Sequence, residues 1–231
     1  MRIIAGIHRG RKILAPAGLT TRPMTDRVRE NLFNLLGDTV AGAAVLDLFC
    51  GSGALGLEAL SRGAAWCTFV DLDRAAAGAV ETNCRRLGLQ GRARILRRDA
   101  LRPGPWLRPG VPGHRPPARQ ACCGPTAGDP AGPGAASPWQ AGTDAYTLIF
   151  VDPPYRMTAD LHGQERLAAL AADLARLGLL AAGATAMLRA ERGVRAALPW
   201  PGFEPADERS YGTTTLYLMT YRGSKSAERR T

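Results

Sequence analysis

Residues 45–56 read Val-Leu-Asp-Leu-Phe-Cys-Gly-Ser-Gly-Ala-Leu-Gly, a short apolar run that ends in a glycine-rich turn. The apolar half predicts a buried strand, and the turn leads into residues 54–62, where apolar side chains recur at helical spacing. Gly51, Gly53 and Gly56 satisfy the G-x-G-x-x-G spacing, which lets the backbone approach a ligand closely at the start of a helix. This stretch therefore predicts a strand, a ligand-binding loop and a helix in succession.

The alternation of strand and helix continues along the chain. Further strands are expected at residues 67–71, 93–97, 147–152 and 185–190, and further helices at 74–87 and 162–177. This rhythm is typical of a parallel sheet with helices on both faces. Residues 205–211 and 213–221 flank Gly212 and predict a terminal antiparallel pair. We therefore expect an α/β fold with a doubly wound, Rossmann-like sheet, mostly parallel, that ends in an antiparallel hairpin.

The first forty residues have a different pattern. Residues 2–15 alternate apolar and basic side chains and hold two glycines, which predicts a small β-hairpin or ribbon. Residues 26–36 have helical apolar spacing, with Thr25 as the expected N-cap and Gly37 as the expected C-cap. We expect a hairpin and helix extension over residues 1–40.

Residues 102–143 interrupt the rhythm of the main domain. They hold ten of the 17 prolines and eight glycines, a composition that buries too little apolar surface to offset the entropy of ordering. We interpret them as an unordered, neutral spacer inserted into a main domain over residues 41–222, with a basic tail over 223–231.

Composition limits the class of protein. A chain of 231 residues with 45% hydrophobic residues can form one large α/β domain. No segment reaches about 18 uninterrupted apolar residues and the N-terminus lacks a signal-peptide run, so we expect no membrane span and a cytoplasmic location. Five cysteines without a C-x-x-C pair argue against a disulfide framework or a metal site. Cys50 and Cys67 are expected to be buried.

The net charge of +10 lies largely at the two ends of the chain. Residues 1–36 carry seven Lys or Arg against two acids, and residues 222–231 carry four against one. Such ends favour a polyanionic partner. The alternative is a coding bias towards arginine, which the high Ala, Gly and Pro content also fits.

Carboxylates stand at three successive strand ends, at Asp47, Asp71 and Asp99. Open α/β sheets bind ligands at this carboxyl edge, and the spacing of glycines and acid also fits a nicotinamide-dependent dehydrogenase. Asp47 argues against that class because a pyrophosphate needs neutral or positive surroundings. A carboxylate there instead suits the cationic amino group of S-adenosylmethionine, with Asp71 on the ribose and Asp99 on the adenine amine.

Asp152-Pro153-Pro154-Tyr155 follows another apolar strand. The prolines restrict the backbone and remove two donors, which leaves nearby carbonyls free to accept hydrogen bonds. Asp152 adds an acceptor and Tyr155 a flat stacking face, an arrangement that suits adenine, cytosine or guanine through its exocyclic amine. The alternative is an ordinary exit from a strand through a Pro-Pro turn.

In this order the motifs resemble a class I S-adenosylmethionine-dependent amino-methyltransferase, and more closely the RsmD family of 16S ribosomal RNA guanine-N2 methyltransferases. The cofactor block of the family stands at residues 47–64, and its N-terminal block at 2–6, 9–12 and 22–34. The N-terminal block separates this family from other D-P-P-Y enzymes. The resemblance covers nearly the whole chain apart from residues 102–143 and the last few.

The resemblance implies an enzyme that transfers a methyl group from S-adenosyl-L-methionine to the 2-amino group of a specific guanine in 16S rRNA. Its partner would be the small ribosomal subunit or an assembly intermediate, and a monomer is expected. The expected catalytic residues are Asp152, Pro153, Pro154 and Tyr155. The expected cofactor-binding residues are Asp47, Phe49, Gly51, Ser52, Gly53, Asp71, Leu72, Asp99 and Ala100. The expected RNA-binding residues are Arg9, Arg11, Lys12, Arg22, Arg27 and Arg29.

Two alternatives stay open. One is a D-P-P-Y methyltransferase that acts on an adenine or cytosine amino group in another nucleic acid, although the chain shows no obvious sequence-reading domain. The other is a non-catalytic ribosome-assembly factor that retains the fold. The intact glycine loop beside an intact Asp152–Tyr155 motif argues against that second alternative.

Overall fold

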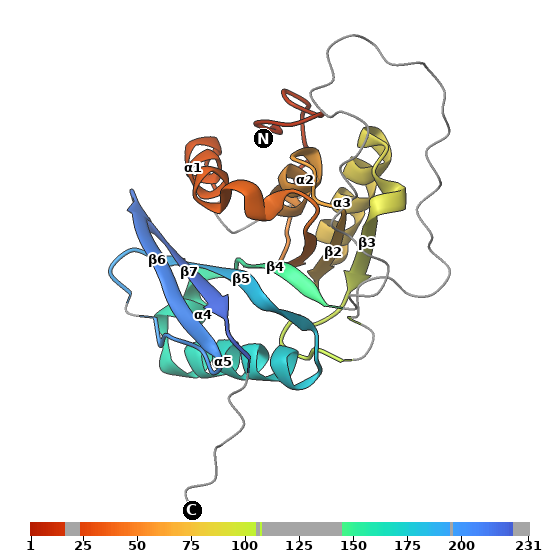
Figure 1. The fold of residues 1–231 in the computed structure, drawn as a ribbon. Coiled ribbons are helices and arrows are strands. Elements are labelled where there is room, and N and C mark those ends of the chain that lie inside the picture. The colour runs from red at the N-terminus through yellow and green to blue at the C-terminus, as the bar shows by residue number, and fades with distance from the viewer. Residues whose placement is uncertain (17–23, 105–106, 108–144, 195, 224–231) are drawn as a thin grey trace, which may run out of the picture.

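The computed structural model describes residues 1–16, 24–104, 107, 145–194 and 196–223. The strands are β1 (Ala44–Leu48), β2 (Trp66–Asp71), β3 (Ala93–Arg97), β4 (Tyr146–Val151), β5 (Leu180–Glu191), β6 (Phe203–Tyr211) and β7 (Thr214–Tyr221). The helices are α1 (Asp26–Leu36), α2 (Ala54–Ser61), α3 (Arg74–Leu87), α4 (Tyr155–Ala159) and α5 (Leu161–Arg176), with short 3₁₀ turns at Gly37–Val40 and Gln90–Arg92. Figure 1 shows these elements arranged around one sheet.

The sheet has the strand order β3-β2-β1-β4-β5-β7-β6. Its first five strands are parallel, and β7 runs antiparallel between β5 and β6. The predicted Rossmann-like sheet with a terminal antiparallel hairpin is therefore confirmed. The order reverses between β1 and β4, because the chain builds outward from β1 to β3 on one side and from β4 onward on the other. Ligands of open α/β sheets bind at the carboxyl ends of the strands at such a switch point.

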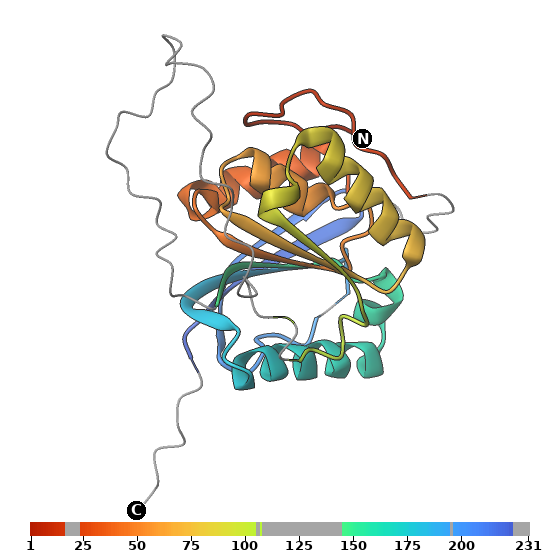
Figure 2. The same ribbon diagram turned by 90° about the vertical axis from the view of Figure 1, so that its right-hand side faces the viewer.

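Helices cover both faces of the sheet, as Figure 2 shows, with α1, α2 and α3 on one face and α5 on the other. Two hydrophobic clusters match this division. Phe69 and Phe150 belong to the cluster beneath α1–α3, and Leu46 and Tyr146 to the cluster beneath α5. Every residue of β1 is buried because both of its faces are covered.

The predicted caps of α1 are confirmed. The Thr25 hydroxyl accepts a hydrogen bond from the Val28 amide, and Gly37 ends the helix with φ of 50°. A hydroxyl at the N-cap satisfies one of the amides that a helix leaves unpaired in its first turn. Asp73, which precedes α3, caps that helix in the same way by accepting from the Ala75 amide at 2.7 Å.

Residues 1–16, here called the N-terminal arm, form the predicted ribbon in reduced form. Arg2 and Lys12 make a single antiparallel bridge, and the Ile3 amide donates to the Arg11 carbonyl at 2.9 Å. The ladder stops there because the next two amides, of Ile4 and Ala5, donate instead to the Glu58 carboxylate on α2, at 2.7 and 3.0 Å. The arm is thus held to a helix rather than to a second long strand.

Further contacts place the arm along α2 and α3. The Ile7 amide donates to the Ser61 carbonyl at 2.9 Å, at the last residue of α2. Asn83 on α3 accepts from the Leu14 amide at 2.9 Å and donates to the Leu14 and Ser52 carbonyls at 3.0 and 3.3 Å. Ile3 and Ile13 are buried in the α1–α3 cluster, so the arm packs on the main core, and the boundary proposed at residue 40 stays a prediction.

The expectation of an unordered spacer over residues 102–143 is wrong for Leu107. Its side chain is 1% exposed within the α5-side cluster, and its carbonyl accepts a hydrogen bond from the Tyr146 hydroxyl. A single large aliphatic side chain between prolines finds a place in the core that composition alone does not predict. Most of the remaining segment, and the tail from residue 224, lies outside the described residues.

Two further expectations concern the core and the membrane. Cys50 and Cys67 are buried as predicted, and so is Cys84. Among the residues that the structure describes, there is no helix with the length and apolar character needed to cross a membrane.

Candidate active site

Residues 49–53, here called the glycine loop, turn sharply between β1 and α2. Phe49, Gly51 and Gly53 all have positive φ, at 58°, 52° and 74°. Glycine adopts this region without steric cost, whereas Phe49 is a strained exception of the kind that clusters at functional sites. A Cβ on Gly56 would lie 2.4 Å from the Phe69 ring and 2.5 Å from the Cys67 sulfur. The third glycine therefore lets α2 pack directly against β2, which fixes the start of the helix.

Asp47 lies beneath this loop and is only 1% exposed. Its Oδ2 atom accepts a hydrogen bond from the Gly56 amide at 2.9 Å, and its buried Oδ1 atom has no hydrogen-bond partner among the described residues. Burial raises the pKa of Asp47 well above its usual range, the Gly56 amide opposes that rise, and the charges of Asp152 and Asp71 add to it. Asp47 thus braces the loop with one oxygen and keeps the other unpaired.

Asp71 ends β2 and braces the other side of the loop. Its two carboxylate oxygens accept from the amides of Gly51, at 2.8 Å, and Asp73, at 2.9 Å. The next residue, Leu72, exposes 65% of its surface. An apolar side chain open to solvent beside a partly exposed carboxylate is an arrangement that suits a nucleoside, because the ring can pack on one and the hydroxyls can bond to the other.

Asp99 and Ala100 follow β3 at the same edge of the sheet. The Asp99 Oδ1 atom accepts from the Leu101 amide at 3.0 Å, which closes a tight turn, and Ala100 is 4% exposed. Ser52 in the glycine loop is 7% exposed, and its carbonyl accepts from Asn83. The structure thus brings the predicted cofactor residues together at the carboxyl ends of β1, β2 and β3.

Asp152 follows β4 on the other side of the switch point. Its amide donates to the Leu48 carbonyl at 3.3 Å, which ties the exits of β4 and β1 together. Pro153 is buried, and Pro154 is the N-cap of α4, with its carbonyl accepting from the Met157 amide at 2.8 Å. Tyr155 is therefore the first residue of a helix that begins three residues after Asp152.

Arg189 is a residue of this site that the sequence analysis missed. It lies on β5 with 6% of its surface exposed. Its Nη1 atom donates to Asp152 Oδ2 at 2.8 Å, and its Nε and Nη2 atoms donate to the Tyr155 hydroxyl oxygen at 3.3 and 3.2 Å. The Tyr155 hydroxyl also contacts the Thr214 hydroxyl at 2.6 Å. The available signal was an arginine inside the apolar run Ala186–Ala190, where an unpaired charge would be costly.

The ion pair sets the charge of the site. Burial raises the pKa of Asp152, and the neighbouring Arg189 guanidinium opposes that rise by charge and by hydrogen bonding. Burial lowers the pKa of Arg189, but Asp152 and Tyr155 outweigh this effect and the pKa lies above its usual value. Arg189 is therefore a fixed cation that limits the rise in the pKa of Asp152.

The predicted RNA-contacting residues fall into three groups. Arg9, Arg11, Lys12 and Arg27 are exposed, and Arg22 lies outside the described residues. The prediction for Arg29 is wrong, because its side chain is completely buried. Arg29 and its neighbour Val28 both lie on the buried face of α1. The Arg29 side chain donates to Asp26 Oδ1 at 2.9 Å and to the Arg2 carbonyl. Arg29 connects α1 with the N-terminal arm and has no surface for a phosphate.

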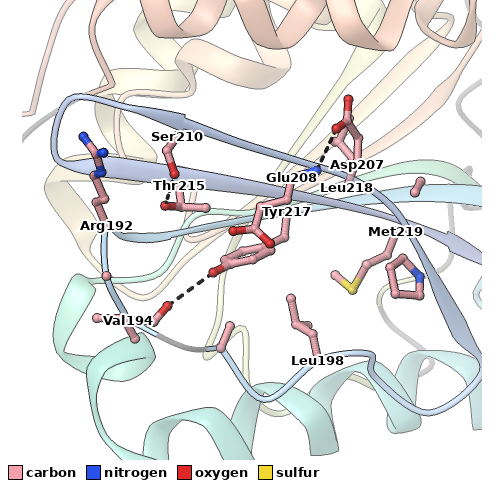
Figure 3. A pocket seen from close by; sticks show the side chains of 14 residues that line it. Arg192, Val194, Leu198, Asp207, Glu208, Ser210, Thr215, Tyr217, Leu218 and Met219 are labelled. Atoms are coloured by element: carbon pink, nitrogen blue, oxygen red, sulfur yellow. Dashed lines mark hydrogen bonds between the residues drawn. The ribbon is translucent and has the colours of Figure 1, made fainter.

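One cavity of the described residues is separate from these site residues. A groove of about 680 Å³ lies between the β6–β7 hairpin and the connection that follows β5, and none of the predicted site residues lines it. Figure 3 shows the Tyr217 hydroxyl crossing it towards the Val194 carbonyl, a hydrogen bond of 3.2 Å, with Ser210 and Thr215 paired at 2.9 Å. These two hydrogen bonds hold the groove wall together, and Arg192, Asp207 and Glu208 also line the groove.

The family model and the named relatives match less than half of this chain. Residues 1–108 match the family model described as Conserved hypothetical protein 95. The Bacillus subtilis protein named putative rRNA methyltransferase YlbH is 49% identical over 102 residues, which cover 44% of this chain and 55% of that protein. Ribosomal RNA small subunit methyltransferase D of Escherichia coli is 48% identical over 101 residues, covering 44% and 50%. The chain thus spans about half the length of the curated relatives it matches.

A solved structure extends the likeness to the whole fold. The putative methyltransferase yhhF from Escherichia coli is 32% identical, with a TM-score of 0.67 over 97% of this chain and 99% of that one. The strand order, the glycine loop and the acids at the strand ends define a class I methyltransferase fold. Within that class, the chain belongs to the RsmD family.

Proposed function

We propose that this protein transfers a methyl group from S-adenosylmethionine to the exocyclic 2-amino group of a guanine in 16S rRNA of the small ribosomal subunit. The observation that carries the proposal is the joining of Asp152 to the glycine-loop strand, through the hydrogen bond from the Asp152 amide to the Leu48 carbonyl. This bond supports the proposal because it joins Asp152, the proposed acceptor for the amine, to the strand that leads into the loop proposed to hold the methyl donor.

The residues present fit S-adenosylmethionine. The Oδ1 atom of Asp47 is buried and unpaired among the described residues, and a donor from the ammonium group of the ligand would satisfy it. Asp71 and the exposed Leu72 side chain offer an acceptor for ribose hydroxyls and an apolar surface for adenine. When bound, the cofactor supplies an electrophilic methyl group on a sulfonium. No phosphate is involved, so a site rich in carboxylates brings no repulsion.

The reaction needs help at the nitrogen of the acceptor. The lone pair of an aromatic amine is delocalised into its ring, so the amine is a weak nucleophile. An N–H bond donated to the Asp152 carboxylate, and a second donated to the Pro153 carbonyl, favour a pyramidal nitrogen whose lone pair points at the methyl carbon. As the N–C bond forms, the C–S bond breaks, and the nitrogen then loses one proton. Fixed positions for both reactants supply much of the acceleration.

RNA contacts are proposed for the exposed basic residues of the N-terminal arm. Arg9 lies in the turn that packs against Ser61, the last residue of α2, whereas the glycine loop precedes the first residue of that helix. A helix of this length spans about 12 Å, less than the width of an RNA duplex. The arm would therefore hold phosphates flanking the target while Tyr155 stacks on a guanine turned out of its surroundings.

The choice of small-subunit rRNA is supported by the name of the Escherichia coli relative, which mentions it. The choice of guanine rests on the resemblance to the RsmD family. A ribosomal RNA substrate implies that the protein is located in the cytoplasm. We propose that the protein acts as a monomer.

The decisive experiment is transfer of a labelled methyl group to naked 16S RNA and to small subunits that lack the modification, followed by mapping of the modified nucleotide. The proposal expects one labelled guanine, modified at N2. Label on an adenine or cytosine amine would show that the base assignment is wrong. Tight binding of S-adenosylmethionine with no transfer to any RNA would favour the assembly factor without catalysis.

A further inference from the structure

A buried arginine is retained in a sheet only where fixed partners replace the water it has lost. Arg189 meets that condition through two residues that come from a different element. Asp152 and Tyr155 lie at the exit of β4, and Arg189 lies one residue beyond the Leu188–Val151 pair that joins β5 to β4. The register of two parallel strands therefore places the cation opposite the exit that would hold the target base.

We propose that Arg189 is a positioning residue that holds Asp152 as an ionised acceptor and orients Tyr155 for the target base. This inference rests on the proposed function, in which Asp152 accepts an N–H from the amine. Because Arg189 engages Oδ2 of Asp152 at 2.8 Å, the other carboxylate oxygen is the one left to face the amine. The Arg189 cation thus determines which oxygen of Asp152 acts.

The ion pair also decides where the proton goes. Burial raises the pKa of Asp152, but a carboxylate held by a guanidinium is a weaker base than the same buried carboxylate without it, because protonation would break a charge-assisted hydrogen bond. Asp152 therefore accepts the hydrogen bond of the amine without keeping its proton. After the N–C bond forms and the C–S bond breaks, the proton passes from the methylated nitrogen to water.

Tyr155 gains its orientation from its hydroxyl group. The hydroxyl oxygen accepts from Arg189 Nε and Nη2 and lies 2.6 Å from the Thr214 hydroxyl on β7. The Arg189 guanidinium carbon is 5.0 Å from the centre of the Tyr155 ring. The ring is thus held at one end by two strands of the sheet, which a phenylalanine at position 155 would not reproduce.

The test compares Arg189→Met, Arg189→Lys and Tyr155→Phe, with Arg176→Met as a control that removes an exposed arginine paired within α5. Methyl transfer is measured at saturating cofactor across the pH range. We expect kcat to fall on the order of 10- to 100-fold in Arg189→Met, with the cofactor Kd changed less than about threefold. Arg189→Lys should recover part of kcat, and Tyr155→Phe should raise KM for RNA more than it lowers kcat.

The acidic limb of the pH profile provides the readout that a structural role would not move. Other charged groups near Asp152 are Arg189 from β5 and Asp47 from β1. Loss of Arg189 leaves burial and the Asp47 carboxylate, both of which favour protonated Asp152. The limb should therefore move to higher pH in Arg189→Met and return towards the wild-type position in Arg189→Lys. A kcat loss with an unmoved limb would overturn the proposal.

A second measurement separates this inference from the proposed function. In protein labelled with ¹³C at the aspartate carboxyl carbons, Asp152 is assigned by its absence in Asp152→Asn and titrated without RNA. A titration at higher pH in Arg189→Met than in the wild type supports the inference, whichever base the enzyme methylates. An identical titration in the two proteins overturns it. If Arg189→Met does not fold, the same comparison is made with Arg189→Lys, where a smaller shift in the same direction is expected.

Discussion

Asp152 is the residue on which the proposed chemistry depends most directly. Asp152→Asn keeps the shape of the side chain but removes the negative charge that binds Arg189 and the amine. We expect kcat to fall by roughly 10²- to 10³-fold, while the Kd for S-adenosylmethionine, measured by calorimetry, stays within about threefold. The matched control is Asp173→Asn, which breaks an exposed ion pair on α5. Unimpaired turnover in Asp152→Asn would remove the residue from the active site.

Asp71 should show the opposite pattern. Asp71→Ala removes the acceptors of the Gly51 and Asp73 amides, so the glycine loop loses its brace on the β2 side. We expect the Kd for S-adenosylmethionine to rise at least about tenfold, since one charge-assisted hydrogen bond contributes about 1.5–3 kcal/mol. The value of kcat at saturating cofactor should change much less. A variant with normal cofactor affinity and lost turnover would assign Asp71 to the chemistry instead.

At the scale of single residues, the sequence predicted the positions that follow from being at a strand end. Asp47, Asp71 and Asp152 fall at the sheet edge because each closely follows or ends an apolar run. Arg189 could not be placed in this way, because its partners depend on the register between β4 and β5. Arg29 was misplaced because counting charges does not tell which face of α1 an arginine occupies.

Two glycines of the N-terminal arm test how the arm is attached to α2. Gly6 and Gly10 share a φ of +81°, but a Cβ on Gly6 would lie 1.9 Å from the Ser61 carbonyl oxygen, whereas a Cβ on Gly10 would meet nothing within 4 Å. Both Gly→Ala variants incur the strain of a left-handed backbone, about 1–2 kcal/mol. We expect Gly6→Ala to lose more free energy of unfolding than Gly10→Ala, as measured by denaturant titration. Equal losses of unfolding free energy in the two variants would mean that the arm detaches readily from α2.

Secondary structure was predictable where pattern and caps agreed. The limits of α1 match the prediction because Thr25 and Gly37 provide both signals. The strand β5 begins at Leu180, five residues before the expected start, because the Ala/Gly-rich residues that open it carry no strand pattern. Its pairing with β4 shifts register in that region, and such irregularities are set by contacts between strands rather than by local sequence.

For the whole molecule, the salt dependence of RNA binding tests the basic surface. Replacing Arg9, Arg11 and Lys12 by Gln should weaken RNA binding and lower the slope of log K against log salt by roughly 2, since each phosphate contact contributes about 0.7–0.9. The control replaces Arg85, Arg176 and Arg209, three exposed arginines elsewhere in the fold, and removes the same net charge. Equal slopes in the two triple variants would show that the arm is not the contact surface.

Asn83 joins two regions that the proposal assigns to different ligands. Its side chain holds Leu14 of the arm and the Ser52 carbonyl of the glycine loop at once. We expect Asn83 to pass the order that the cofactor brings to the loop on to the arm, and by thermodynamic reciprocity RNA on the arm would then strengthen cofactor binding by the same factor. We expect this cooperativity, measured as the ratio of the cofactor Kd without and with RNA, to disappear in Asn83→Ala. The cofactor and the RNA would then bind independently of each other.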